Sequence, residues 1–169
     1  VGLTLQNAWD GGGGAIFNLG TSLIFQSLLF QNNKAISSGG GALNSSGGDA
    51  IFMDGVTFDN NESQTQDGGA LYLSGSSSNV TIQNVTFSNN KAAQSGGAAY
   101  FTGTGTTNFF WLLDTVQFND NESLNGTANN GSHQSGGGGA IFNAVDYDET
   151  TIFKNCTFDG NKATEGKGG

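Results

Sequence analysis

The fold is decided by residues 68–99, GGALYLSGSSSNVTIQNVTFSNNKAAQSGGAA. This stretch opens on the box Gly68-Gly69-Ala70-Leu71 and contains the box Phe87-Ser88-Asn89-Asn90. It closes on a second copy of the first box, Gly96-Gly97-Ala98-Ala99. One glycine-rich box and one phenylalanine box therefore make up a unit of 28 residues.

Both boxes recur along the chain. The Gly-Gly-Ala-apolar box occurs at Gly13–Ile16, Gly40–Leu43, Gly68–Leu71, Gly96–Ala99 and Gly138–Ile141, and another copy begins at Gly168-Gly169. The Phe-x-x-Asn box lies between these copies, at Phe30–Asn33, Phe58–Asn61, Phe87–Asn90, Phe118–Asn121 and Phe158–Asn161. Successive first glycines are separated by 27, 28, 28, 42 and 30 residues. Two sequence boxes that keep alternating along the chain at similar separations indicate a structural repeat.

Apolar residues alternate ahead of each phenylalanine box. A period of two is typical of a β-strand with one buried face. No stretch has a clean helical period, and glycine is too frequent for helices. The side chains that we expect to face inward are Leu23, Phe25 and Leu28; Ile51, Met53 and Val56; Val80, Ile82 and Val85; Trp111, Leu113 and Val116; and Ile152, Phe153 and Cys156.

A single unit cannot cover its own apolar face, but stacked units cover one another. The repeat therefore predicts an all-β fold, a single-stranded parallel β-helix (β-solenoid) of about five coils of about 28 residues. The phenylalanines should form an internal column and the asparagines a hydrogen-bonded ladder. These structural residues are Phe30, Phe58, Phe87, Phe118 and Phe158, and Asn33, Asn61, Asn90, Asn121 and Asn161. The pattern leaves open whether the alanine of each glycine box or the apolar residue after it faces inward.

The chain is expected to form one β-helix segment over residues 1–169. Because it begins without Met and stops within a glycine box, we expect it to be part of a longer repeat array. The step from Phe118 to the first glycine of the next glycine box is 20 residues, whereas it is nine or ten residues in the other coils. The excess predicts a protruding loop over residues 124–135, since an insertion between stacked strands must leave the core.

Composition excludes several classes of protein. A formal charge of −9 with five lysines and no arginine argues against a nucleic-acid partner, because phosphate binding needs a cationic face. One cysteine excludes an internal disulfide framework and a cysteine-cluster zinc site. No apolar run approaches the ~20 residues of a membrane span. We expect no cofactor and no metal ion.

The alternation of Gly-Gly-Ala-Ile with Phe-x-x-Asn resembles the repeats of the polymorphic outer membrane protein family, first known from chlamydiae. The closest copies are Gly13–Ile16, Gly138–Ile141, Phe30–Asn33 and Phe87–Asn90, and the resemblance covers residues 11–169. It implies that the β-helix is right-handed and acts as a secreted passenger or adhesin. A location outside the cell or on its surface follows from the same resemblance.

An enzymatic function has to be considered because β-helices also house polysaccharide lyases and hydrolases. Lyases of that shape use an arginine or lysine base with acidic calcium ligands, and hydrolases need two carboxylates at a set separation. Asp54 and Asp114 occupy the same repeat position, but two coils apart, at about 10 Å, with the neutral Gln83 between them. We therefore predict that the protein is not an enzyme.

Other chemistry-bearing residues receive a structural interpretation. His133 has no catalytic partner in its Gly/Ser/Asn loop, and the acidic run Asp146, Asp148 and Glu149 lacks a calcium-binding spacing. Cys156 is expected to be a buried, unreactive thiol. Trp111 should lie in the core, while Trp9 could stack on a sugar.

Eight Asn-x-Ser/Thr sequons make glycosylation a further hypothesis. Asn61 and Asn121 are also ladder positions, so their amides should be buried. Asn84 and Asn155 precede inward residues and should point outward. The candidate acceptors are Asn125, Asn130, Asn84, Asn79, Asn155 and Asn44.

Three functions remain open on the sequence. The first is a non-catalytic adhesin or stalk-like module whose partners are other surface proteins, a host receptor or glycans. The second is the glycosylated structural subunit of an extracellular filament, which would associate end to end through open β-helix ends, because unpaired strand edges must be capped or paired. The third is an enzyme acting on polysaccharides.

Overall fold

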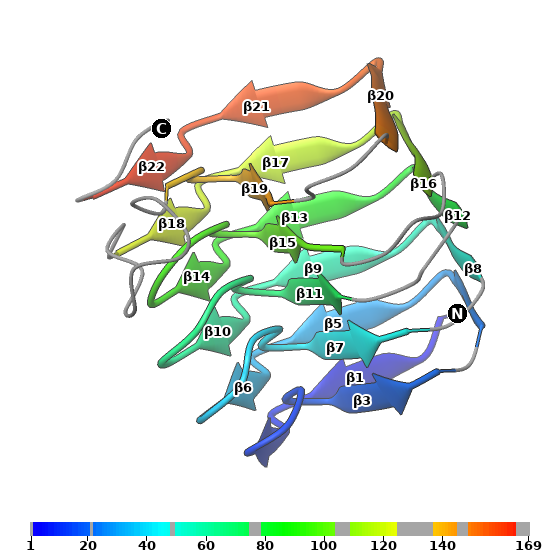
Figure 1. The fold of residues 1–169 in the computed structure, drawn as a ribbon. Helices are drawn as coiled ribbons and strands as arrows, with labels where there is room; N and C mark the ends of the chain where they lie inside the picture. The colour runs from blue at the N-terminus through cyan, green and yellow to red at the C-terminus, as the bar shows by residue number, and fades with distance from the viewer. Residues whose placement is uncertain are drawn as a thin grey trace.

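The computed structural model describes residues 2–20, 22–47, 50–74, 79–103, 109–124, 137–144 and 149–164. All regular secondary structure in these ranges is β-strand, and the chain winds through four parallel sheets that we call A to D. Each coil adds one short strand to each sheet, so the coils stack into a rod (Figure 1). The all-β parallel solenoid expected from the repeat is confirmed.

Sheets A and B contain six strands each. Sheet A stacks β1 (Thr4–Gln6), β5 (Leu29–Gln31), β9 (Thr57–Asp59), β13 (Thr86–Ser88), β17 (Gln117–Asn119) and β21 (Thr157–Asp159). Sheet B stacks β2 (Trp9–Asp10), β6 (Lys34–Ala35), β10 (Glu62–Ser63), β14 (Lys91–Ala92), β18 (Glu122–Ser123) and β22 (Lys162–Ala163).

Sheets C and D contain five strands each. Sheet C stacks β3 (Ile16–Leu19), β7 (Leu43–Ser46), β11 (Leu71–Ser74), β15 (Ala99–Phe101) and β19 (Ile141–Asn143). Sheet D stacks β4 (Leu23–Gln26), β8 (Ala50–Asp54), β12 (Asn79–Gln83), β16 (Phe109–Asp114) and β20 (Glu149–Lys154).

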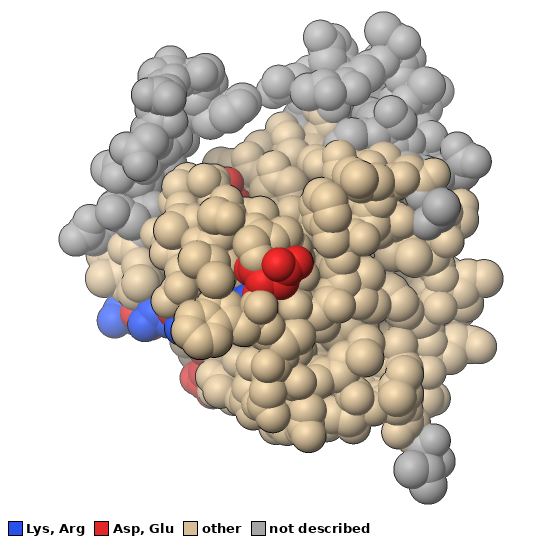
Figure 2. Space-filling model, turned by 90° about the horizontal axis from the view of Figure 1, so that it is seen from below, with Lys and Arg blue, Asp and Glu red and all other residues tan. Residues whose placement is uncertain are grey.

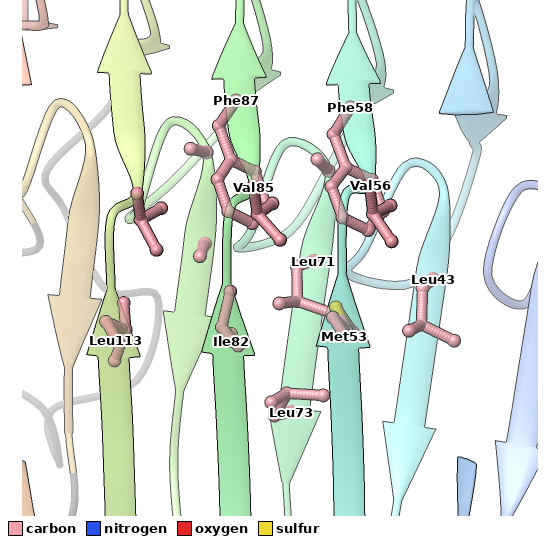
Figure 3. Close-up of a cluster of buried hydrophobic side chains, with 14 of the residues drawn as sticks. Leu43, Met53, Val56, Phe58, Leu71, Leu73, Ile82, Val85, Phe87 and Leu113 are labelled. Carbon is pink, nitrogen blue, oxygen red and sulfur yellow. The ribbon is translucent and has the colours of Figure 1, made fainter. Parts of the chain in front are cut away.

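The phenylalanines of the repeat form a single internal file. Neighbouring rings from Phe30 to Phe158 stack with centroids 4.8–5.0 Å apart and interplanar angles of 3–8°. The spacing equals the separation of paired strands, because each ring belongs to the next coil in register. Side chains of sheets C and D, such as Leu71 and Ile82, complete the core beside this file (Figure 3).

The inward positions of sheet D follow the sequence pattern in every coil but the last. There, Thr151 pairs with Trp111 and Phe153 with Leu113, while Ile152 pairs with the outward Leu112. The expectation that Ile152 faces inward is therefore wrong. In the run Thr151-Ile152-Phe153, alternation alone would allow either Ile152 or Phe153 to face inward. Only the register with the neighbouring coil decides which of the two side chains does so.

The glycine box turns the chain from sheet B into sheet C. Gly96 has a φ of +66°, and a Cβ on Gly97 would lie 2.6 Å from the Glu122 nitrogen and would clash with the Gly139 carbonyl oxygen. The two glycines thus serve different needs, a left-handed backbone and a close approach of the next coil. The sequence pattern left open whether the alanine of the glycine box or the apolar residue after it faces inward. Both positions are buried, since Ala70 and Leu71 are both inaccessible to solvent.

Candidate functional site

The asparagines of the repeat form a continuous ladder beneath the corner between sheets A and B. The Asn61 Nδ2 donates hydrogen bonds to the Asn90 Oδ1 at 3.0 Å and to the Phe30 carbonyl at 3.1 Å. Its Oδ1 accepts from the Nδ2 and backbone nitrogen of Asn33. The same bonds repeat through Asn90, Asn121 and Asn161. Each inner amide is fully used, so the ladder is structural and offers no binding group.

Outside this ladder, sheet B carries a row of alternating charges that the sequence reasoning missed. Lys34, Glu62, Lys91, Glu122 and Lys162 are in register, one in each of five successive coils. The ion pairs are Lys34–Glu62 at 2.8 Å, Lys91–Glu122 at 3.4 Å and Lys162–Glu122 at 3.7 Å. The signal was present, because the residue after each ladder asparagine alternates between Lys and Glu. We call these five residues the charge row.

The charge row shifts the titration of Glu122. Partial burial raises the pKa of its carboxyl, but a hydrogen bond from Thr164 and the cations of Lys91 and Lys162 outweigh this and lower the pKa overall. A groove of about 260 Å³ runs beside the row, lined by Lys34, Glu62 and Lys91, by ladder residues and by the outer amides of Asn32, Asn60 and Asn89. All of the residues that line this groove are polar or charged.

The carboxylates considered for catalysis lie along the corner between sheets D and A. Asp54 and Asp114 both pair with Gln83, so they are two coils apart as the repeat predicts. A hydrogen bond from Lys154 lowers the pKa of the Asp114 carboxyl, and bonds from Asn155 and Thr115 act in the same direction. A carboxyl group whose pKa is lowered is a poor proton donor at neutral pH.

Asp59 lies on sheet A and is also held as a carboxylate. Burial raises its pKa, but hydrogen bonds from Asn89, Gln31 and Ser88 together outweigh burial and lower it. Within the described ranges, no group of three or more His, Cys, Asp or Glu side chains could hold a metal ion. Asp54, Asp59 and Asp114 each accept hydrogen bonds from side chains of a neighbouring coil.

The remaining candidates have separate environments. Trp111 is buried in the core and meets the Phe101 ring edge-on at 4.6 Å, as expected, while Trp9 is exposed on sheet B. Cys156 is half-buried, with its Sγ 3.4 Å from the Leu113 carbonyl. His133, Asp146, Asp148, the Glu149 side chain and the loop predicted over residues 124–135, apart from Leu124, lie outside the described residues.

The sequons fall into two structural groups. Asn79, Asn84 and Asn155 are exposed, whereas Asn61 and Asn121 are buried in the ladder. Asn44 differs from its expectation: it is only 6% exposed, and its Nδ2 donates to the Gly39 carbonyl at 3.1 Å. Asn44 is buried because it lies in register with Tyr72 on sheet C, and the side chains of this row lie over the glycine turns. Asn125 and Asn130 lie outside the described residues.

An apolar row runs along the outer face of sheet D. Its members are in register, with Ile24, Phe52, Thr81, Leu112 and Ile152 contributed by successive coils. Ile24 is 73% exposed and Ile152 39%, and the nearby Phe110 is 44% exposed. Such a row is unusual on a solvated sheet face. We call it the sheet D row.

Both ends of the described solenoid also expose large apolar side chains. An open cavity of about 660 Å³ near the C-terminal end is lined by Ile141, Phe153 and Phe158 together with glycines and asparagines. The opposite end, formed by β1 to β4, shows acidic atoms near its centre, and lysines of later coils are seen at one side of the molecule (Figure 2). Within the described ranges there is no helix long and apolar enough to cross a bilayer.

Stacked coils that form four parallel sheets, with rows of side chains on the outer faces, define a β-solenoid repeat protein. Three segments of the chain, residues 27–46, 55–74 and 84–102, match the family model of the Chlamydia polymorphic membrane protein repeat. The resemblance seen in the sequence is therefore confirmed over residues 27–102, where three segments are similar to this repeat. No curated protein and no solved structure matches the chain.

The matched segments have the same place in each coil. Each begins at the corner before sheet A, at Ser27, Gly55 or Asn84, and ends in or just after a strand of sheet C. The strands β8 and β12 of sheet D lie between the segments and outside the match. The matched segments thus contain strands of sheets A, B and C and no strand of sheet D.

Proposed function

We propose that this chain is a non-catalytic, adhesin-like module exposed on a cell surface. The proposal is supported by the repeat family, which is one of surface proteins, and by the solenoid fold, whose core is filled by structural side chains. The carboxylates of Asp54, Asp59 and Asp114 are tied into hydrogen bonds between coils and form no recognisable catalytic arrangement. Function then belongs to the outer rows.

The observation that carries the proposal is the position of sheet D relative to the repeat match. The family pattern stops at sheet C, and the unmatched sheet D presents the exposed sheet D row. In repeat proteins, the face that varies between copies is often the binding face, since core positions are constrained by stacking. Sheet D is therefore the proposed binding face.

The chemistry of this face favours a protein partner. The sheet D row presents mainly hydrocarbon, which suits apolar side chains better than sugar hydroxyls. Asp54 and Asp114 lie beside the sheet D row, and both are in register with Gln83. The whole chain carries a net charge of −9. A partner with a basic rim around an apolar centre would complement both features.

The test uses beads coated with the protein and applied to a panel of cultured cells. The variant Ile24→Lys/Ile152→Lys places two charges on sheet D, and Thr57→Lys/Gln117→Lys places two on the outer face of sheet A as a matched control. We expect only the first variant to lose binding, by more than tenfold, and protease treatment of the cells to abolish binding. Equal binding by both variants would contradict the proposed face.

A second candidate is the structural subunit of an extracellular filament. It is favoured by the apolar ends, where β1 to β4 and β19 to β22 are paired on one side only among the described strands. Trp9 at one end and Phe153 and Phe158 at the other are exposed. Electron microscopy of purified protein separates the two candidates, because a filament should show fibres with a regular axial repeat and an adhesin module isolated rods.

A further inference from the structure

Two sequons occupy the same corner of the solenoid, between sheets D and A. They are Asn84-Val85-Thr86 and Asn155-Cys156-Thr157. We propose that Asn84 and Asn155 are N-glycan acceptor sites, and that the folded coil excludes glycans from the ladder sequons at Asn61 and Asn121. The inference rests on the surface location proposed above, but not on the binding face.

The backbone and side chain of the two corner residues are alike. Both have a φ of 52°, and both side chains are exposed. The Asn84 Nδ2 donates to the Asp54 Oδ1 at 2.8 Å, and the Asn155 Nδ2 donates to the Asp114 Oδ1 at 3.0 Å. Each amide thus uses one hydrogen in a bond to a carboxylate of the preceding coil.

This geometry fits the bond that a glycan makes. N-glycosylation replaces one of the two hydrogens on Nδ2 with the anomeric carbon of the first sugar. The remaining hydrogen can keep the bond to Asp54 or Asp114, and the sugar can extend from the exposed side of the amide. The corner can therefore carry a glycan without losing a contact between coils.

The ladder sequons have the opposite geometry. The Nδ2 of Asn61 donates to Phe30 and Asn90, and the Nδ2 of Asn121 donates to Phe87 and Asn161, so both hydrogens are used. Asn61 is 1% exposed and Asn121 is inaccessible. A sugar on either amide would break a buried hydrogen bond and would have no room between the stacked coils.

The reaction needs one co-reactant, an oligosaccharide linked to a lipid through pyrophosphate. The asparagine Nδ2 attacks the anomeric carbon, the new C–N bond forms, and the bond from that carbon to the pyrophosphate oxygen breaks. The lipid pyrophosphate leaves and Nδ2 loses one proton. Glycans at the two corners would stand two coils apart on one edge of the rod, about 10 Å from each other.

The test is site-by-site mass spectrometry of the chain after secretion from a glycosylating eukaryotic host. We expect Asn84 and Asn155 to be occupied in the secreted protein and Asn61 and Asn121 to be unoccupied there. Any chains glycosylated at Asn61 or Asn121 should be retained in the cell as misfolded protein. Occupancy is read on the secreted chain without any binding assay, so its outcome is independent of the adhesin proposal.

Matched variants separate the sequon from the fold. Thr86→Ala and Thr157→Ala destroy the sequons but leave the bonds to Asp54 and Asp114 in place, and each should remove one glycan. Thr86→Ser and Thr157→Ser keep the sequons and should keep both glycans. Secreted protein that lacks glycans at both corners would overturn the proposal, as would secreted protein that carries one at Asn61 or Asn121.

Discussion

At the scale of single residues, adjacent asparagines in one box have different tasks. Asn60 is exposed and takes a left-handed backbone with a φ of 53°, a conformation that asparagine tolerates better than most residues. Asn61, the next residue, is buried and joins the ladder. The pairs Asn32-Asn33 and Asn89-Asn90 repeat this division. Position within the coil, and not residue type, decides which asparagine is structural.

Replacing a ladder asparagine should therefore cost far more than replacing its neighbour. Asn90→Ala leaves Asn61, Asn121 and the Phe58 carbonyl without their buried partner and should lower the free energy of unfolding by about 3 kcal/mol. Asn89→Gly keeps the left-handed corner and should cost less than about 1 kcal/mol. Urea unfolding followed by circular dichroism measures both, and equal losses would show that the ladder is dispensable.

The second glycine of the box permits a close approach of two coils. Gly97→Ala would place a methyl group against the Gly139 carbonyl and should destabilise the fold by about 3 kcal/mol or more. Gly12→Ala is the control, because the nearest atom, in the Phe17 ring, would lie 3.4 Å from its Cβ. Thermal unfolding of both variants is the measurement, and a Gly97→Ala protein as stable as Gly12→Ala would contradict the close approach.

At the scale of elements, the two-residue strands of sheet B are held by their outer side chains as well as their backbone. The charge row alternates in sign from coil to coil, so each coil meets an opposite charge in the next. Such half-exposed pairs contribute about 0–1 kcal/mol each. These ion pairs matter because each two-residue strand of sheet B has room for only one inward side chain.

Glu122 makes this contribution depend on pH. Its folded pKa lies below the ordinary value of 4.5, so its stabilisation is fully present above pH 4.5 and is lost as the pH falls through the folded pKa. Comparison of unfolding at pH 7 and pH 3 should show a loss that is smaller in Glu122→Gln by up to about 1 kcal/mol. Added salt should shrink the difference. An identical loss in the variant would refute the role of Glu122.

Sheets A, B and C could be predicted from the sequence better than sheet D. The phenylalanine and asparagine boxes give the phase of sheets A and B, and the glycine box gives that of sheet C. Sheet D has no such anchor, and at Ile152 the alternation alone gave the wrong direction. The charge row and the sheet D row were missed because their members lie in different coils and become neighbours only once the register is known.

At the scale of the whole molecule, each coil contacts only the coils on either side of it. Stability should therefore be nearly a sum of coil terms and interface terms. Deleting residues 56–84 would join Gly55 to Val85 and stack Phe30 on Phe87 and Asn33 on Asn90, since these pairs have equivalent positions. We expect this shortened chain to fold as a solenoid with one coil fewer.

The same deletion would place Lys34 beside Lys91, because Glu62 is removed from the charge row. Lys34→Glu should then stabilise the shortened chain by about 0.5–1 kcal/mol. In the full chain the same change sets a second carboxylate against that of Glu62 and should be destabilising. Urea midpoints of the four proteins check the reversal of sign, and an effect of one sign in both backgrounds would contradict the register of the row.

The bonds that join one coil to the next run along the rod, whereas the covalent chain runs around it. A pull on the two ends would therefore load the hydrogen bonds of a single interface before it loads any peptide bond. When one coil gives way, about 4.8 Å of rod becomes a tether of roughly 90 Å, because about 28 residues straighten. A cell held by such a rod would be released stepwise, with each lost coil absorbing part of the force before the next is strained.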